Sequence, residues 1–291
     1  MTSKELTSFP QIYFSIIVPN RNYSQYLVTC LSSIAFQECT NYEVLICDGC
    51  SSDNSLDLIS EYLRDSRFKL VSTSDNGQAN AINKAISISL GTYITYLNSD
   101  DYYLSTKTLS TALAYFSSHP NVHVVSFGGF YSNSAGQLVK KIDYSLNGFV
   151  NLYDFNKRVA LLQPGSFWRR NVHDCGLIFR EDFKSSFDTL FFWDLYSLGF
   201  IFLLVDTPVA CYRLHGDNIS TNNYLGKLHD KSRFLRIQKK YFSSCYLTFF
   251  YRFFSSLNMF LPAKIADKVL LFFRFFNNSL SYITHHFFPS F

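Results

Sequence analysis

Two adjacent carboxylates at the end of an apolar run are the residues of this chain best placed to do chemistry. Asp100 and Asp101 follow the apolar segment 93–97, with no Lys or Arg beside them. Adjacent carboxylates repel each other, and proteins commonly keep them ionised with a hard divalent cation whose other ligands are substrate phosphates. A helix N-cap or a solvated turn is the ordinary alternative. The pair therefore predicts a Mg²⁺ or Mn²⁺ site if further polar residues meet it.

The elements around this pair would bring two other polar segments to it. Apolar runs typical of buried strands end at the turn Pro19–Asn22 and at Asp48, and segments with helical spacing of apolar residues lie between the runs. This alternation favours a mostly parallel sheet with helices on both faces, in which ligands bind beyond the carboxyl ends of the strands. We therefore expect the three polar segments to converge on one edge of the sheet. The expected strands are 14–18, 43–47, 68–71 and 93–97, and the expected helices are 26–36, 56–63 and 79–90.

Beyond residue 120 the alternation of strands and helices weakens. The expected elements there are antiparallel strands at 122–127 and 137–142, an aromatic helix at 189–198 and a strand at 200–205. A polar, basic stretch at 221–240 indicates a boundary. We therefore expect one domain at 1–220 and a helical tail at 221–291.

Composition and charge exclude several classes of protein. Apolar residues make up 47% and charged residues 16% of the 291 residues, which excludes a disordered chain, a collagen-like repeat and a long coiled coil. The first 220 residues contain 16 Lys or Arg and 20 Asp or Glu, whereas the last 71 contain 10 and 2. An acidic body therefore precedes a basic tail.

Cysteine usage and the N-terminus indicate a reducing compartment. The seven cysteines have no disulfide-framework spacing, and the N-terminus lacks the apolar core of a secretory signal. We therefore expect a cytoplasmic protein. Cys47 and Cys50 form a C-x-x-C pattern, but Cys47 ends an expected strand and no second pair completes a zinc site. A buried structural thiol is therefore the favoured interpretation of Cys47.

Several well-known signatures are absent from the sequence. It contains no G-x-G-x-x-G after a strand, no G-x-x-x-x-G-K-[ST], no G-x-S-x-G and no H-E-x-x-H. Dinucleotide-binding, P-loop, serine hydrolase and zinc protease functions therefore lose their main support.

Four segments in order resemble the family 2 inverting glycosyltransferases, which have the GT-A fold. Residues 15–22 (SIIVPNRN) resemble the first strand and V-P-x-x-N turn of that family, and residues 43–53 (EVLICDGCSSD) resemble its second strand and D-G-x-S-x-D loop. Residues 75–84 (DNGQANAINK) resemble its D-x-G-x-x-x-A-x-N-K segment, and residues 91–101 (GTYITYLNSDD) its strand and DxD-type loop. The resemblance extends over about 14–220. Bacterial members of this kind commonly build surface polysaccharides such as O-antigen.

The resemblance implies a GT-A α/β fold, with a mostly parallel central sheet flanked by helices, and a UDP-sugar donor bound by a half at about 14–120. Many members of the family have Asp where this chain has Asn98, which lowers the local negative charge by one. The nucleotide-binding residues that the resemblance implies are Pro19, Asn22, Asp48, Asn83, Lys84, Asn98 and Ser99. The implied ligands of Mg²⁺ or Mn²⁺ are Asp100, Asp101 and His215.

An acceptor half at about 121–220 would follow. Residues 163–170 (QPGSFWRR) resemble the Q-P-x-x-F-x-R-R segment of the family, and residues 212–215 (YRLH) resemble its late Y-R-x-H element. The resemblance implies acceptor or diphosphate contacts for Gln163, Arg169 and Arg213.

The first Asp of the helix near 188–199 is, by the same resemblance, the catalytic base. An inverting transfer needs one base to deprotonate the acceptor hydroxyl as it attacks the anomeric carbon. Asp188 is the candidate, and a helix N-cap is its structural alternative. The rival carboxylates are Glu181, Asp182 and Asp194.

The C-terminal tail combines aromatic and basic residues. From Tyr241 to Phe291, 17 of 51 residues are Phe or Tyr, and Arg252 and Arg274 interrupt the apolar runs, so we expect no transmembrane helix. Around 264–278 a narrow cationic stripe lies opposite a Phe-rich face, which suits a helix in the interface of an anionic membrane. A helical hairpin packed on the domain, or an oligomer contact, is the alternative. The acidic body argues against nucleic acid as a partner.

These patterns predict a cytoplasmic glycosyltransferase on the inner face of the cell membrane. It would move a hexosyl or N-acetylhexosaminyl group from a UDP-sugar to a polyprenyl-diphosphate-linked or polysaccharide acceptor. The alternative is a nucleotide-sugar-binding protein without catalysis on the same fold. The oligomeric state stays open.

Overall fold

The computed structural model describes residues 12–71, 76–142, 144, 147–150, 161–183, 185–216, 218, 230, 233 and 236. The chain divides into two units, Met1–Lys227 and Leu228–Phe291, and the fold below is that of the first. The predicted tail lies outside the described residues, apart from three isolated positions, so the interfacial helix stays a prediction. Within the described part of the chain, no helix is both long and apolar enough to cross a bilayer.

Strands and helices alternate through the first half of the unit. The elements are β1 (Phe14–Asn20), α1 (Ser24–Ala35), β2 (Tyr42–Asp48), α2 (Ser55–Tyr62), β3 (Phe68–Leu70), α3 (Gln78–Ile88), β4 (Tyr93–Tyr96), β5 (Tyr102–Tyr103), α4 (Thr108–Ser118), β6 (Val124–Ser132), β7 (Leu138–Ile142), β8 (Gly148–Phe149), the 3-10 turn η1 (Gln163–Gly165), β9 (Ser166–Arg169), η2 (Arg170–His173), α6 (Phe187–Ser197) and β10 (Phe202–Arg213). The strands and helices expected before residue 100 are confirmed, with ends that differ by at most two residues.

The strands form one sheet in the order β3-β2-β1-β4-β9-β6-β10-β5, with β7 beside β6 and β8 beside β10. β3, β2, β1 and β4 are parallel, as expected. Beyond β4 the sheet is mixed, because β9 is antiparallel to β4 and β6 whereas β6 and β10 are parallel. The expected antiparallel pair β6–β7 is confirmed, and a short turn with a hydrogen bond from Gly136 N to Asn133 O joins it. Such a turn can connect only antiparallel strands. The predicted mostly parallel sheet is confirmed for β3, β2, β1 and β4 and for the long β6–β10 ladder, and the shorter ladders of β5, β7, β8 and β9 are antiparallel.

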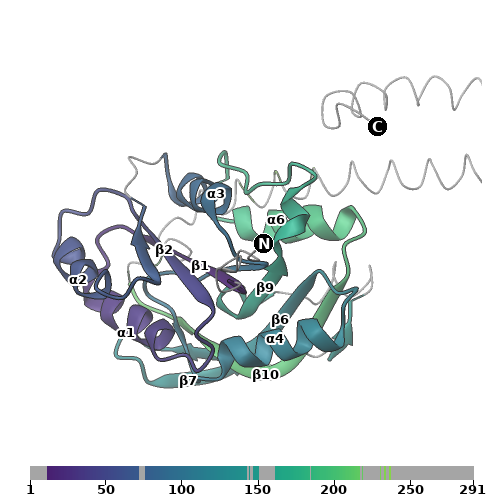
Figure 1. Cartoon of the computed structure of the whole chain (residues 1–291), viewed down its shortest axis with the longest axis horizontal. Coiled ribbons are helices and arrows are strands. Elements are labelled where there is room, and N and C mark those ends of the chain that lie inside the picture. The colour runs from purple at the N-terminus through teal and green to yellow at the C-terminus, as the bar shows by residue number, and fades with distance from the viewer. Residues whose placement is uncertain are drawn as a thin grey trace, which may run out of the picture. The chain divides into compact units, whose positions relative to one another are not determined.

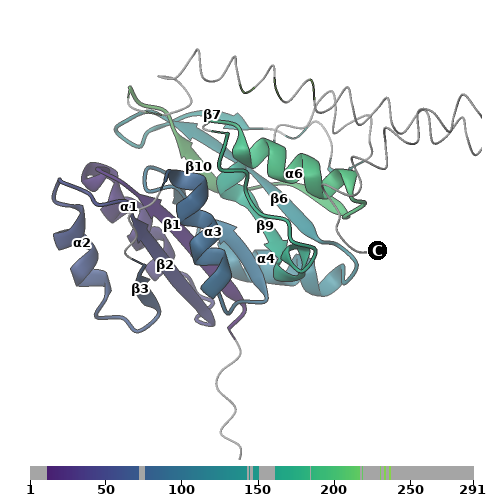
Figure 2. The same ribbon diagram turned by 90° about the horizontal axis from the view of Figure 1, so that it is seen from above.

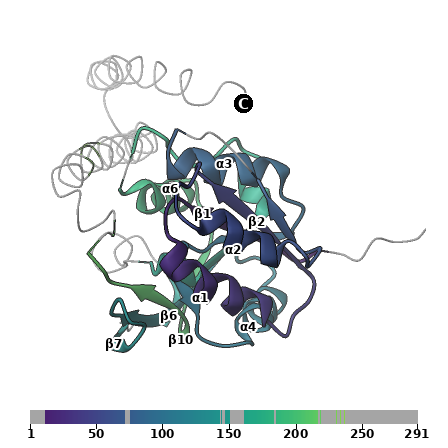
Figure 3. The ribbon, with the colours of Figure 1, turned by 90° about the vertical axis from the view of Figure 1, so that its left-hand side faces the viewer.

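Helices cover both faces of this sheet. α1 and α4 lie on one face, and α3 and α6 lie on the other (Figure 1, Figure 3). Leu27 and Leu31 of α1 and Phe116 of α4 pack in one buried cluster with Ile16 and Val44 of the central strands. The central strands are buried along their whole length, which explains why each has a continuous apolar sequence instead of an alternating one.

Helix α4 was not predicted. Its buried residues Leu109, Ala112 and Phe116 are three and four positions apart, which is the spacing of one helix face. Ser and Thr residues surround them and weaken the apolar signal.

A buried carboxylate ties the amino-terminal ends of the strands together. Glu43, near the start of β2, is 2% exposed, and its carboxylate accepts hydrogen bonds from Ser15 Oγ at 2.7 Å, Leu90 N at 2.6 Å and Lys69 Nζ at 2.9 Å. Burial alone would raise the pKa of Glu43, but these hydrogen bonds outweigh it and lower the pKa. Position 91 beside Ser15 requires glycine, because an added Cβ would lie 2.4 Å from Ser15 N. This network is therefore a fully satisfied structural site.

Candidate functional site

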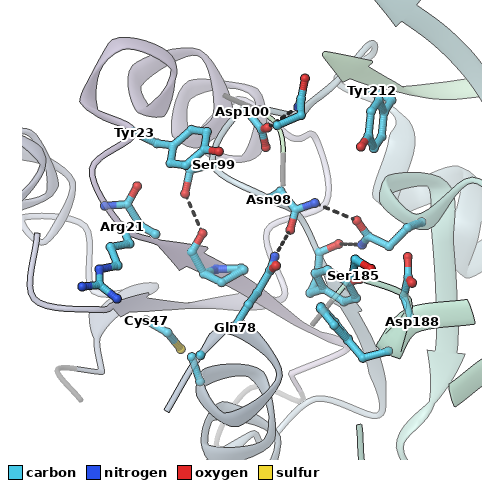
Figure 4. A pocket seen from close by; sticks show the side chains of 18 residues that line it. Arg21, Tyr23, Cys47, Gln78, Asn98, Ser99, Asp100, Ser185, Asp188 and Tyr212 are labelled. Atoms are coloured by element: carbon cyan, nitrogen blue, oxygen red, sulfur yellow. Dashed lines mark hydrogen bonds between the residues drawn. The ribbon is translucent and has the colours of Figure 1, made fainter. Parts of the chain in front are cut away.

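A cavity of about 300 Å³ lies at the carboxyl ends of β1, β2 and β4 (Figure 4). The expected convergence of polar segments occurs there, because Asn20 and Asp48 are partners in the parallel β1–β2 register and residues 98–100 follow β4. The first turns of α3 and α6 and the end of β10 complete the wall. The predicted site residues that line the cavity are Pro19, Asn98, Ser99, Asp100, Gln163 and Asp188.

Asp48, predicted to contact the nucleoside, forms hydrogen bonds with its own loop and with the end of β1. Its carboxylate is 3% exposed and accepts hydrogen bonds from Asn20 Nδ2 at 2.8 Å and from Ser51 N and Oγ at 2.8 and 2.7 Å. Asp48 does not line the cavity, whereas Asn20 does. Asn20 therefore lines the cavity and Asp48 orients it through their hydrogen bond, and the nucleoside contact of Asp48 stays a prediction.

Asn22, also predicted to bind nucleotide, joins the β1 turn to the β2 loop. Its φ angle is 59°, its backbone N donates to Ser51 Oγ at 2.9 Å and its Oδ1 accepts from Ser52 N at 2.7 Å. Ser99 Oγ donates to Pro19 O at 2.6 Å and ties the β4 loop to the same turn. Asn22 therefore shapes the cavity wall without lining it, while Pro19 and Ser99 form part of that wall.

Asn98 connects two other amide side chains across the cavity wall. Its Oδ1 accepts from Gln78 Nε2 at 2.6 Å, and its Nδ2 lies 3.2 Å from Gln163 Oε1 (Figure 4). The same Nδ2 lies 3.3 Å from Asp101 Oδ2. Gln163 Nε2 in turn donates to Tyr96 O at 2.6 Å. An aspartate at position 98 could donate to neither acceptor, so asparagine sets the direction of this chain of hydrogen bonds.

Asp100 faces the cavity and is 9% exposed. Its Oδ2 lies 3.0 Å from His215 Nε2 and 3.1 Å from Asn218 Nδ2. The imidazole of His215 packs against the rings of Tyr23 and Tyr26, at centroid distances of 5.7 and 4.6 Å. Burial raises the pKa of Asp100, and the hydrogen bond from His215 opposes that rise.

Asp101 and Arg213 hold the 98–101 loop to β10. Asp101 is 1% exposed, and its Oδ1 accepts from Arg213 N at 3.0 Å. Arg213 Nε donates to the backbone O of Asp100 at 2.8 Å, and its guanidinium lies over the rings of Tyr26 and Tyr102 at 4.8 and 5.2 Å. Burial, and then the charge of Asp100, raises the pKa of Asp101 well above its usual value. Neither Asp101 nor Arg213 lines the cavity, so the structure does not bring them to it, and the metal contact of Asp101 and the acceptor or diphosphate contact of Arg213 stay predictions.

The donor atoms around Asp100 fit a metal ion that is shared with a ligand. The described residues contain no cluster of three or more His, Cys, Asp or Glu side chains able to enclose an ion. A single carboxylate can hold a cation that takes its remaining ligands from phosphate and water, and Asp100 is the predicted ligand that faces the cavity. His215 does not line the cavity, and its Nε2 lies 3.0 Å from Asp100 Oδ2.

Of the four carboxylates considered as the base, Asp188 is the one that lines the cavity. It is half-buried in the first turn of α6, and its Oδ1 accepts from Thr189 N at 2.7 Å. Asp194 forms an ion pair with Arg180 at 3.2 Å. The other two, Glu181 and Asp182, are exposed outside the cavity wall.

Asn83 and Lys84 of α3 do not line the cavity, although both were predicted to bind nucleotide. The residues of α3 that line it are Gln78 and Ala81. Asn83 instead bonds to the backbone of Phe179, with its Nδ2 2.8 Å from Phe179 O. For Asn83 helical geometry explains this, because it follows Gln78 by five positions and so lies on a different face of the helix.

Arg169 lies at the other end of the sheet from the cavity. It pairs with Tyr93, the first residue of β4, and its guanidinium donates to Val122 O at 2.7 Å and Phe116 O at 3.2 Å. The predicted acceptor or diphosphate contact of Arg169 is thereby corrected to a packing role.

The prediction also missed several lining residues. The recognised motifs at 15–22 and 75–84 contain Asn20, Arg21 and Gln78, so these motifs could have suggested them. Tyr212 adjoins Arg213 in the same way. Asn218 belongs to no recognised pattern, and only its hydrogen bond to Asp100 reveals it.

Comparison with known proteins identifies the family. Residues 15–187, more than half of the chain, match the model of Glycosyl transferase family 2. The chain belongs to this family. Over 184 residues, this family 2 member is 28% identical to poly(ribitol-phosphate) beta-N-acetylglucosaminyltransferase TarS of Staphylococcus aureus, a match that covers 61% of this chain and 31% of TarS. It is 32% identical over 108 residues to the PGL/p-HBAD biosynthesis glycosyltransferase of Mycobacterium bovis, which covers 36% and 42% of the two chains. The chain thus spans less than half the length of these relatives.

Solved structures show which fold this family 2 member has. TarS residues 1–349 in complex with UDP-GlcNAc match it with a TM-score of 0.62 at 24% identity, over 73% of this chain and 61% of that one. The mannosyltransferase PcManGT of Pyrobaculum calidifontis, in complex with GDP-Man and Mn²⁺, matches with a TM-score of 0.55 at 18% identity, over 72% and 59%. These likenesses confirm the predicted GT-A fold.

Proposed function

We propose that this family 2 protein transfers a sugar from a UDP-sugar to an acceptor hydroxyl, with inversion at the anomeric carbon. The observation that supports this most is that Asp100 and Asp188 line one cavity at the carboxyl ends of β1, β2 and β4. A relative of the same fold binds UDP-GlcNAc, which supports a nucleotide-sugar as the ligand. The donor would extend from the wall at Arg21 toward Asp188, and these two residues lie on opposite sides of Asn98 (Figure 4).

In the proposed reaction Asp188 is the general base. Its carboxylate accepts the proton of the acceptor hydroxyl while the hydroxyl oxygen forms a bond to the anomeric carbon. The bond from that carbon to the diphosphate oxygen breaks on the opposite face, and UDP leaves with the bonding electrons. The first turn of α6 suits this role, because the amino-terminal end of a helix stabilises the ionised carboxylate that a base requires.

A divalent cation would be held by Asp100 and His215. Mg²⁺ or Mn²⁺ supplies positive charge to the leaving diphosphate when it is bound. Asn218 keeps the Asp100 carboxylate in place through Oδ2, and Arg213 holds the backbone O of the same residue. A structural relative with bound Mn²⁺ supports the choice of ion.

For the acceptor we propose a cell-surface glycan, either on a polyprenyl diphosphate carrier, as in O-antigen assembly, or as a growing polysaccharide. Two relatives are named for polymer synthesis: TarS acts on poly(ribitol-phosphate), and chondroitin synthase of Escherichia coli is 38% identical over 89 residues, 30% of this chain and 13% of that enzyme. The basic aromatic tail would place the protein on the inner face of the membrane. Cosedimentation of the full chain with anionic but not with neutral vesicles is the expected result, and equal recovery with both would contradict this placement.

The test of the proposed function begins with binding and ends with turnover. A thermal-shift panel of UDP-, GDP- and dTDP-sugars with and without Mn²⁺ should identify a UDP-sugar as the stabilising ligand. Asp188→Asn should then retain UDP binding and lower turnover by about 100- to 10,000-fold, the contribution of a general base. The alternative, a nucleotide-sugar-binding protein without catalysis, predicts binding without turnover in the unaltered chain.

A further inference from the structure

The side chain of Asn83 in α3 forms hydrogen bonds with both backbone groups of Phe179, as a neighbouring strand would do. Its Oδ1 accepts from Phe179 N at 2.9 Å, and its Nδ2 donates to Phe179 O at 2.8 Å. A single side-chain amide therefore satisfies both backbone groups of a residue 96 positions away, and buried backbone groups require such partners. This contact specifies where the segment before α6 lies against α3.

A second residue of α3 extends the contact to Glu181. Asn83 Nδ2 lies 3.1 Å from Glu181 Oε1, and Asn80 Nδ2 donates to Glu181 Oε2 at 3.0 Å. We call these hydrogen bonds of Asn80 and Asn83 to Phe179 and Glu181 the α3 bridge. Within the bridge, Asn83 contacts Phe179 and Glu181, whereas Asn80 contacts Glu181.

The ring of Phe179 packs against α6. Phe179 is fully buried, stacks on Phe191 with a centroid distance of 4.2 Å and meets Phe187 edge-to-face at 5.8 Å. These two α6 residues stand immediately before Asp188 and three positions after it. Close-packed rings transmit a displacement because they leave little room to relax. A shift of Phe179 therefore displaces the first turn of α6, which contains Asp188.

The other face of α3 forms part of the donor wall. Gln78 and Ala81 line the cavity, and Gln78 holds Asn98 through the 2.6 Å hydrogen bond. α3 and α6 cover the same face of the sheet (Figure 2). One helix thus contacts both the donor wall and the segment that supports the base.

We propose that Asn83 is a positioning residue for the transfer reaction, which holds Asp188 at a fixed place relative to the donor wall without touching the nucleotide. The proposal rests on the proposed function, since it presupposes that Asp188 is the base. Small errors in the placement of a reacting group lower the rate steeply, by about 100-fold for a displacement of 1 Å. The loss of Asn83 is therefore expected in turnover and not in donor affinity.

Asn83→Ala in the full chain tests the proposal, with Asn80→Ala as the matched control on the same helix. The measurements are the dissociation constant of UDP with Mn²⁺ by calorimetry, UDP release from the donor that the thermal-shift panel selects, and the melting temperature. We expect Asn83→Ala to lower turnover per folded molecule about 10- to 100-fold and to leave the UDP dissociation constant within about twofold. Asn80→Ala, which spares the Phe179 contact, should change both quantities by less than about threefold.

A second pair of variants keeps the test valid if Asn83→Ala does not fold. Asn83→Asp retains an acceptor for Phe179 N but places a charge against the Phe179 carbonyl and Glu181, so its turnover should fall. Adding Glu181→Gln removes the like charge and should restore part of that turnover.

Two results would overturn the positioning role, and another would refute the proposed function on which it rests. A UDP dissociation constant that rises in parallel with the loss of turnover would make Asn83 a nucleotide-binding residue. Unchanged turnover per folded molecule with a lower melting temperature would make it a purely structural one. A wild-type protein that binds no nucleotide and releases no UDP would refute the proposed function itself, whereas active wild-type protein with equally active Asn83→Ala refutes the positioning role alone.

Discussion

Buried carboxylates lie at both ends of the parallel part of the sheet, and their surroundings differ. Glu43 at the amino-terminal end is 2% exposed, and its hydrogen bonds lower its pKa although burial opposes this. Asp100 and Asp101 beyond the carboxyl end of β4 are 9% and 1% exposed, and burial raises the pKa of both although hydrogen bonds oppose this. The charge of Glu43 is therefore compensated within the fold, whereas that of Asp100 and Asp101 is compensated incompletely.

This difference distinguishes a stabilising carboxylate from a functional one. A buried charge with insufficient partners costs stability, and proteins accept that cost where a ligand compensates it. The hydrogen bonds of Glu43 leave nothing for a ligand to add. Asp100 instead faces a cavity, where a cation with a diphosphate would supply the missing compensation. Substitution at the two ends should therefore have opposite consequences.

Among substitutions that test this comparison, Asp100→Asn should have the largest effect, and that effect is on turnover. Removal of the carboxylate should lower UDP release about 100- to 1,000-fold, the range seen when one electrostatic group of a transition-state site is lost. The melting temperature without metal should stay equal or rise, because an incompletely compensated buried charge has been removed. Activity and calorimetric melting on the same preparation measure both. A melting temperature lower by several degrees would show that Asp100 stabilises the fold as Glu43 does.

Glu43→Gln should have the reverse pattern. The glutamine NH₂ would face a donor in place of a carboxylate oxygen, so we expect a loss of about 3 kcal/mol in the free energy of unfolding with turnover per folded molecule within about twofold. Urea unfolding measures the loss. Glu61→Gln is the control: Glu61 pairs with Arg64 at 2.9 Å on the surface, and its loss should cost less than about 0.5 kcal/mol.

The stability difference between wild type and Glu43→Gln should depend on pH. Because the pKa of Glu43 is lowered on folding, its contribution is fully present above the unfolded pKa of about 4.3 and is lost as the pH falls through the folded pKa. The stability difference between wild type and Glu43→Gln should therefore be constant from pH 7 to about pH 5 and shrink below about pH 4. A difference that persists unchanged at pH 3 would mean that charge is not what Glu43 contributes.

The smallest expected effect comes from Asn98→Asp, which adds a charge at the cavity. The aspartate could no longer donate to Gln163 or Asp101, and it would repel the Asp101 carboxylate, whose Oδ2 now lies 3.3 Å from Asn98 Nδ2. We expect a loss of about 1–2 kcal/mol without metal and a larger thermal shift on addition of Mn²⁺ than in wild type. Scanning fluorimetry with and without Mn²⁺ measures both, and identical shifts in the two proteins would argue against a cation at this end.

The first half of the fold could be predicted because its strands are central and parallel. Such strands are buried on both faces, so each is a continuous apolar run that stands out in the sequence. The second half could not be predicted as well. β9 is a four-residue strand, Ser166–Arg169, inside a segment that was interpreted only as a motif. Its antiparallel partners, β4 and β6, are about 75 and 40 positions away, and no local pattern encodes such pairings.

Part of the site could be predicted because ligands bind at particular ends of strands and helices. Asp100 and Asp188 stand where a strand ends and where a helix begins, and ligands bind at such positions in α/β sheets. Asp101 and Asn83 belong to motifs just as clear, yet they do not line the cavity. A motif specifies which residues are present and their spacing along the chain, and not the direction in which each side chain projects.

By itself, then, the sequence determined the family, the parallel first half and the pair of carboxylates, since these follow from residue types and short spacings. The tertiary structure decided which side chains face the donor cavity and which support it. Asn218 reaches Asp100 across 118 positions, and Asn83 holds Phe179 across 96. Burial and hydrogen-bond partners of this kind exist only after the chain has folded, because they join residues that have no local relation to each other.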